Sequence, residues 1–201
     1  MPASRRAAWG TISREQIVET ALDVVRSGRY EQLTIRGLAA KLGVAPMSLY
    51  RHVRDKDDLL DEVVDRLLAD VWKPRAKPGD VRGFITEASE RLRRFLVSQP
   101  AALHVFLRHP LTSPNAVARM EAMIDAFCQA GFTPRAARQA FATVQTYTVG
   151  FAALEASRER WVPRETTTDA LTRQLASLTT PRQFAVGLQC LLDGLEQRRG
   201  A

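Results

Sequence analysis

Apolar residues recur at spacings of three and four along most of the chain, which is the period of an α-helix with one buried face. Ile17, Ala21 and Val24 show this spacing near the start of the chain. Ser13 stands three residues before a glutamine, as in a capping box that begins a helix, and Gly28 is a typical helix end. The pattern therefore predicts a helix between Ser13 and Gly28.

The same period continues to the end of the chain. It predicts a helix from Asp55 to Val71 and, after the segment 73–80, two helices with apolar faces over 85–95 and 117–127. Ser113, Thr133 and Thr180 each precede a proline, which favours a helix start because the hydroxyl caps the first turn and proline needs no amide partner there.

The segment 141–151 is the exception by composition, since its β-branched and aromatic residues favour a strand. Its apolar residues nevertheless keep the helical rhythm from Ala140 to Leu154, with no turn residue on either side. We predict a helix here as well, so the expected fold class is all-α.

The amino-acid composition indicates where the protein is expected to be located and how its charge is distributed along the chain. The 201 residues are 45% hydrophobic and 25% charged, with no apolar run long enough for a spanning helix or a signal peptide, so a cytoplasmic protein without a membrane segment is expected. Cys128 and Cys190 lack the spacing of a zinc site or disulfide framework. Residues 1–56 contain ten Lys or Arg against five Asp or Glu, which is five of the net charge of +7. Such a basic end favours a phosphate-rich partner, either nucleic acid or anionic lipid.

Residues 34–53 have the pattern of a helix-turn-helix, with two short helices on either side of Gly43. Leu38, Leu42, Leu49 and Val53 can form the shared apolar interior of the two helices. The second helix would then present short side chains near its start and polar or cationic ones farther along, which suits a DNA major groove. The alternative is an αα-hairpin with a solvated basic face.

The segment LTIRGLAAKLGVAPMSLYRHVRDKDDLLDEVV resembles the TetR family of bacterial transcriptional repressors, and the rest of the chain resembles its tetracycline-repressor branch more loosely. The resemblance implies a helix-turn-helix DNA-binding domain over 1–56, a helical ligand-binding and dimerisation domain over 57–201, and the Asp55 to Val71 helix as their connection. It implies base contacts from the start of the second helix and phosphate contacts around it. The candidate DNA-binding residues are Thr34, Arg36, Ala45, Pro46, Met47, Ser48, Tyr50, Arg51, His52 and Lys56. A guanine contact and a phosphate contact both stay open for Arg36.

The second half of the chain offers two further candidate sites. An apolar cavity with a few polar atoms would be lined by Phe84, Ala88, Phe106, Met120, Met123, Phe127, Phe141, Gln145 and Thr148. Two stripes with four-three spacing would pair with a second copy of the chain, through Val144, Tyr147, Phe151, Leu154, Phe184, Leu188, Leu191 and Leu195. An ordinary intramolecular core is the alternative for both sets.

No metal and no cofactor are expected, because His104 and His109 have no matching set of histidines and carboxylates. The three histidines of the chain also fit no catalytic signature, so no catalytic residue is predicted. The predicted function is a sequence-specific transcriptional regulator: a homodimeric repressor that binds a palindromic operator duplex and is released by a small-molecule inducer. The alternative is a basic helical membrane-surface or scaffolding protein without specific DNA recognition.

Overall fold

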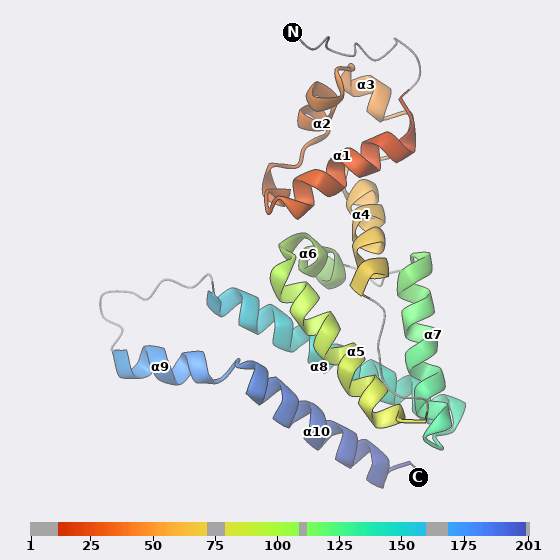
Figure 1. The fold of residues 1–201 in the computed structure, drawn as a ribbon, viewed down its shortest axis with the longest axis vertical. Helices are drawn as coiled ribbons and strands as arrows, with labels where there is room; N and C mark the ends of the chain where they lie inside the picture. Colours follow the sequence, from red (N-terminus) through yellow and green to blue (C-terminus); the bar gives the residue numbers. More distant parts are fainter. Residues whose placement is uncertain (1–11, 72–78, 109–111, 160–168, 200–201) are drawn as a thin grey trace. The chain divides into compact units, whose positions relative to one another are not determined.

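A computed structural model describes residues 12–71, 79–108, 112–159 and 169–199, and within these ranges the regular structure is entirely helical (Figure 1). His109 and most of the segment 73–80 lie outside the described residues. The helices are α1 (Arg14–Arg26), the 3₁₀ turn η1 (Tyr30–Gln32), α2 (Ile35–Leu42), α3 (Pro46–Leu49), α4 (Lys56–Val71), α5 (Val81–Ser98), α6 (Pro100–Arg108), α7 (Pro114–Gln129), α8 (Pro134–Glu159), α9 (Asp169–Ser177) and α10 (Pro181–Gln197). The all-α prediction is confirmed, including the helix over 141–151, which lies inside α8.

The contacts divide the chain into two compact units, residues 1–63 and 64–201. Helix α4 contributes residues to both units, because the division falls within it. The domain boundary expected at residue 56 stays a prediction. No described helix is long and apolar enough to cross a membrane.

The first unit is built on the core that the helix-turn-helix pattern predicts. Ser13 and Gln16 form the expected capping box of α1, and Ile17, Leu38 and Leu49 are fully enclosed. Helix α3 is shorter than expected, since it ends at Leu49 and continues only as a turn. In that turn the Val53 N–H donates to the Leu49 carbonyl at 3.0 Å, which brings Val53 into the core.

The second unit is centred on α8, which contacts α5, α6, α7 and α10. Its core joins apolar residues of α5, α7, α8 and α10, among them Ile85, Phe127, Val144 and Phe184. Helices α6 and α9, each of nine residues, were not predicted from the sequence.

A buried ion pair also fixes this unit. Arg93 of α5 donates from Nη1 to both carboxylate oxygens of Glu155 in α8, at 2.6 and 2.5 Å. The Arg93 guanidinium lies 5.3 Å from the centre of the Phe184 ring of α10, within the range of a cation–π contact. One side chain thereby joins three helices.

Two of the three predicted hydroxyl caps are confirmed. Thr133 accepts from the Ala136 N–H at 3.2 Å and Thr180 from the Gln183 N–H at 3.1 Å. Ser113 makes no such bond at the start of α7. The carboxylate of Asp65 in α4 instead accepts the Asn115 N–H at 3.0 Å, so a residue distant in the sequence caps α7.

Candidate nucleic-acid interface and ligand-binding core

The turn between α2 and α3 orients the candidate DNA-binding residues. Thr34 begins α2 by accepting the Gly37 N–H at 2.9 Å. Gly43 ends the helix with φ 69°, in the left-handed region that favours glycine because it has no side chain. This sharp end turns the chain directly into α3.

Helix α3 presents its predicted reading face to solvent. Met47 is 70% exposed and Tyr50 49%, whereas Leu49 between them is fully buried. An exposed apolar side chain at the start of the second helix of a helix-turn-helix suits contact with base edges or thymine methyl groups. None of the ten candidate residues is buried: Thr34, Arg36, Ala45, Pro46, Met47, Tyr50 and Arg51 are exposed, and Ser48, His52 and Lys56 are partly exposed.

Arg14, which was not predicted as a functional residue, holds the end of this motif in place. Its Nε donates to Glu62 at 2.7 Å and its Nη1 to Asp58 at 3.3 Å, both on α4. The same Nη1 also donates to the carbonyl of His52. Helix α1, the turn after α3 and the first turns of α4 are thus joined through one guanidinium.

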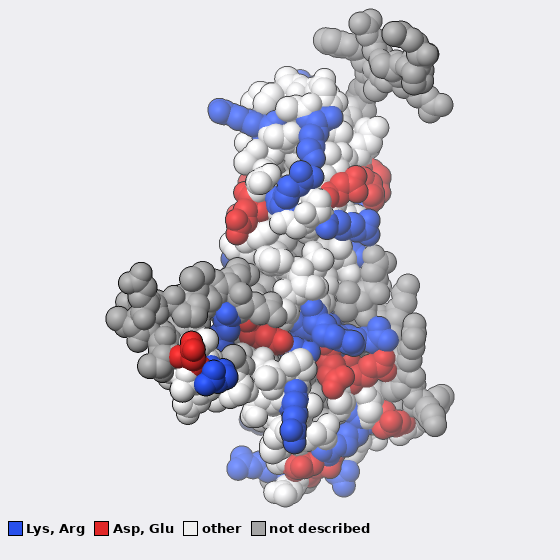
Figure 2. Space-filling model, turned by 60° about the vertical axis from the view of Figure 1, so that its left-hand side comes forward, with Lys and Arg blue, Asp and Glu red and all other residues white. Residues whose placement is uncertain are grey.

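The charge on this unit agrees with an interface for phosphates. Figure 2 shows Lys and Arg side chains over the upper part of the N-terminal unit and two separate groups of Asp and Glu side chains lower on the same unit. Positive potential at the end that carries α2 and α3 would attract a nucleic-acid backbone.

The predicted cavity residues of the C-terminal unit lie in or beside its core. Ala88, Met123 and Phe127 belong to the buried core, with Phe84 and Phe141 packed against it. Thr148 is buried and donates its hydroxyl to the Val144 carbonyl, while Phe106 is partly buried and Met120 is 37% exposed. Their role in binding a ligand stays a prediction.

Arg119 of α7 is a polar residue beside the predicted cavity residues, and it was not identified from the sequence. It is almost fully buried, and its Nη2 donates to Gln145 of α8 at 2.6 Å. Burial lowers the pKa of this guanidinium to about 10, because the charged form loses water. A buried arginine beside the predicted Gln145 adds a polar element to a mostly apolar region. An arginine in an amphipathic helix has no sequence signal for burial, which is why it was missed.

Most of the predicted pairing residues lie inside one chain. Val144, Phe151, Phe184 and Leu188 are core residues, and the Tyr147 ring stacks on Phe184 with centres 5.3 Å apart. Leu191 and Leu195 are partly buried and Leu154 is 56% exposed. Core side chains of one chain cannot also cover a partner, and the pairing role of the remaining residues stays a prediction.

No group of three histidine, cysteine, aspartate or glutamate side chains among the described residues could hold a metal ion.

Two family models match the chain, and together they cover most of it. Residues 17–63 match the model of the tetR family of bacterial regulatory proteins, and residues 73–199 match that of the tetracyclin repressor-like C-terminal domain. The chain belongs to the TetR family. It is a DNA-binding transcriptional regulator, as the sequence predicted, and its relatives are regulators rather than known enzymes.

Individual relatives agree with this membership. The transcriptional repressor DrrR1 of Streptomyces coeruleorubidus is 31% identical, over 94% of this chain and 81% of that protein. A transcriptional regulator of Saccharopolyspora erythraea is 33% identical over 72% of this chain, a match that spans 61% of the relative. Among solved structures, the TetR-family protein ActR of Streptomyces coelicolor in complex with actinorhodin is 25% identical, with a TM-score of 0.76 over 96% of this chain and all of that one.

Proposed function

We propose that this TetR-family regulator is a repressor that binds a palindromic operator as a dimer and leaves it when a small molecule binds the C-terminal unit. The observation that carries the proposal is the exposed face of α3, where Met47 stands out beside a buried Leu49. Bases would be read by Ala45, Pro46 and Met47, and by Arg36 at the start of α2, because residues at helix starts reach base edges. Phosphates would be bound by Thr34, Ser48, Tyr50, Arg51, His52 and Lys56.

Pairing is proposed through the exposed sides of α8 and α10. Leu154 and Val186 are large apolar side chains with about half their surface exposed, and Cys190 lies one turn beyond Val186. Apolar stripes on two helices of each chain form a four-helix bundle across a two-fold axis. Two copies would place two helix-turn-helix motifs on the two halves of a palindrome, about 34 to 36 Å apart.

The ligand is proposed to enter the region between α5, α7 and α8, the helices that carry most of the predicted cavity residues and the Arg119–Gln145 hydrogen bond. DrrR1 and the ligand-bound ActR support a small-molecule-responsive repressor by similarity. An apolar surround with one or two polar groups is the usual character of a small-molecule site.

Helix α4 is the proposed route from the ligand to DNA. Arg14 binds it at Asp58 and Glu62 in the first unit, and Asn115 of α7 binds it at Asp65 in the second. A ligand that displaces α7 would therefore shift α4 through the Asp65–Asn115 hydrogen bond. We call the Asp65–Asn115 contact the α4–α7 latch.

The function is tested by selecting bound sequences from random duplexes with the full chain, and then by screening small molecules for release of the selected duplex. A palindromic motif and at least one releasing compound are expected. Lys56→Ala tests the phosphate contacts separately. Loss of one such contact should weaken binding of selected and random duplexes alike and lower the salt slope by about one. Failure to enrich any sequence would contradict the proposal.

A further inference from the structure

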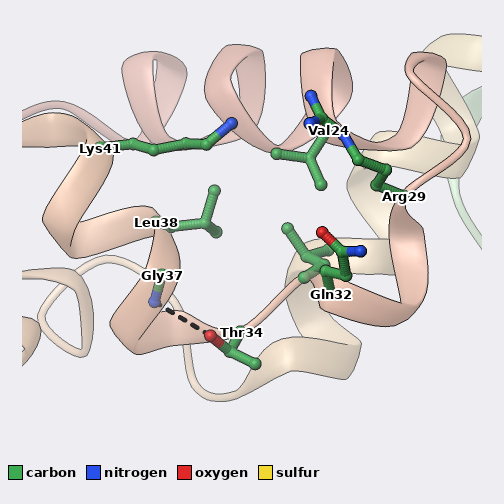
Figure 3. A pocket seen from close by; sticks show the side chains of 8 residues that line it. Val24, Arg29, Gln32, Thr34, Gly37, Leu38 and Lys41 are labelled. Carbon is green, nitrogen blue, oxygen red and sulfur yellow. Dashed lines mark hydrogen bonds between the residues drawn. The ribbon is translucent and has the colours of Figure 1, made fainter.

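The N-terminal unit contains a small pocket away from the reading face of α3. It has a volume of about 100 Å³ and lies between the end of α1, the α1–α2 connection and α2 (Figure 3). Val24, Leu33 and Leu38 supply its apolar part. Arg29, Gln32 and Lys41 supply polar side chains around it.

Two cationic side chains line this pocket. Figure 3 shows the Lys41 side chain extending along α1 toward Arg29, so that both positive groups lie on the same side of the pocket. None of the eight residues that line the pocket is acidic. Two positive charges on the same side of a small pocket repel, and an anion bound between them would replace this repulsion with attraction.

The donors that remain at the pocket suit a tetrahedral anion. Arg29 uses Nε to donate to Ser27 at 3.1 Å, and its two terminal nitrogens carry four further N–H donors. The Thr34 hydroxyl lies across the pocket from both cations, where it accepts the Gly37 N–H at 2.9 Å. The helix amide is therefore already satisfied, and side chains rather than the helix terminus would hold the anion.

The volume of the pocket limits the size of the ligand that it could bind. Pockets for drug-sized molecules have about 300 Å³ or more, which is well above the volume found here. One phosphate group fits a pocket of about 100 Å³, and its several acceptor oxygens match a guanidinium and an ammonium on one side of that pocket.

We propose that the Arg29–Lys41 pocket is a phosphate-binding site, separate from the reading face of α3 and from the ligand site of the C-terminal unit. The phosphate can come from the backbone of bound DNA or from a free phosphorylated compound. Thr34 lies at the pocket and is itself a proposed backbone contact, which makes operator DNA a direct source. A free phosphorylated compound would instead occupy the pocket without DNA.

The test uses the full-length Arg29→Gln/Lys41→Gln double variant. Arg29→Lys/Lys41→Arg keeps both charges, and Arg135→Gln/Arg138→Gln removes two exposed charges of α8 and matches the change in net charge. All four substituted residues are exposed, so the variants should fold. Thermal melting of each variant checks this. Binding of inorganic phosphate is followed by ³¹P line broadening at constant ionic strength, and duplex binding by its salt dependence.

The expected result is that the Gln variant loses phosphate broadening, with affinity reduced about tenfold or more, while both controls keep it. A salt slope for duplex DNA that also falls by about 0.9 assigns the phosphate to the DNA backbone. An unchanged slope assigns it to a free compound. If phosphate broadening and the salt slope for duplex DNA are both unchanged, or if the Arg135/Arg138 control loses as much as the Gln variant, the proposed site is wrong. Operator binding by the unaltered chain is measured in the same titrations. Failure of the proposed repressor function would therefore be distinguished from failure of the phosphate-site proposal.

Discussion

Arg14 links three parts of the N-terminal unit, and its partner Asp58 makes this link sensitive to acid. Burial acts to raise the pKa of Asp58, but hydrogen bonds from the Arg54 N–H and the Arg14 side chain, with the two positive charges, outweigh it. The pKa of Asp58 therefore lies below its ordinary value of 3.8. A carboxylate with a lowered pKa stabilises the fold above its unfolded pKa, and this stabilisation is lost as the pH falls through the folded value.

We predict that Arg14→Gln lowers the free energy of unfolding by about 1 kcal/mol at neutral pH, a modest loss because Arg14 is 41% exposed and water screens its charge. The difference from the unaltered chain should shrink as the pH falls below 3.8. Urea unfolding across this range measures it. Arg54→Gln is the control, since that side chain is 84% exposed and should change stability by less than about 0.5 kcal/mol. A difference that persisted in acid would contradict the ionic origin.

Met47 carries a prediction about specificity. Its side chain is 70% exposed at the start of α3, so Met47→Gln should change which duplexes are selected, at about 1 to 3 kcal/mol for each altered base pair. Helical content should stay the same because the residue supports no core. Parallel selections with both proteins decide the matter, and an unchanged motif would remove Met47 from the reading residues.

Single residues show where sequence reasoning succeeds and where it stops. Met47 and Leu49 were placed correctly, on opposite sides of α3, because local period decides which side of a helix faces the core. Arg14 could not be assigned, because its partners Asp58 and Glu62 lie 44 and 48 residues away. Nothing in a local pattern indicates a contact at that separation.

Among the elements, α4 and α7 carry the prediction on switching. Asn115→Ala removes the side-chain donors to Asp65, which measure 2.8 Å to its carboxylate and 3.3 Å to its carbonyl. If the α4–α7 latch transmits ligand binding, the ratio of ligand dissociation constants with and without operator should move toward one. Operator affinity without ligand should change little. Calorimetry with the releasing compound measures the ratio, and an unaltered ratio would place the coupling elsewhere.

Helices α8 and α10 approach closely at Gly187. A side-chain carbon there would overlap the Tyr147 hydroxyl, which donates to the Phe184 carbonyl at 3.0 Å. We expect Gly187→Ala to destabilise the fold by about 1 to 3 kcal/mol, because the Tyr147 and Phe184 rings must shift. Gly194→Ala on the same helix is the control, since an added carbon meets nothing within 4 Å. Chemical unfolding should separate the two variants, and equal stabilities would mean that the rings adapt freely.

The start of α7 shows why element ends are harder to predict than elements. A hydroxyl before a proline marked the helix start correctly, but Asp65 of α4 supplies the cap. The segment 141–151 shows the opposite case, because its period prevailed over its strand propensity once the residues packed inside α8.

For the whole molecule, the decisive question is which apolar stripe pairs two chains. Val186 is 50% exposed and Leu188 on the same helix is fully buried. Val186→Glu should give folded monomers with weak operator binding, since one motif alone loses the second half-site. Leu188→Glu should instead unfold the C-terminal unit, because a charge would enter the core. Sedimentation and circular dichroism distinguish them, and a dimeric Val186→Glu protein would move the interface.

This contrast also explains why the pairing surface was not fully predictable. The four-three spacing identified Phe184 and Leu188 as residues that share a face with one another. Spacing cannot tell whether the opposite helix belongs to the same chain or to a second copy, and here α8 of the same chain covers them.

The positions of the Arg14 contacts and of the α4–α7 latch along α4 set a rule for building hybrid regulators. A DNA-binding unit moved onto another TetR-family ligand domain must carry Asp58 and Glu62, because α1 binds both. The recipient must keep its own equivalent of Asp65, because α7 is capped there. A joint between Glu62 and Asp65 should therefore give hybrids that respond to the recipient's ligand, whereas a joint at residue 56 would separate Arg14 from both of its carboxylates.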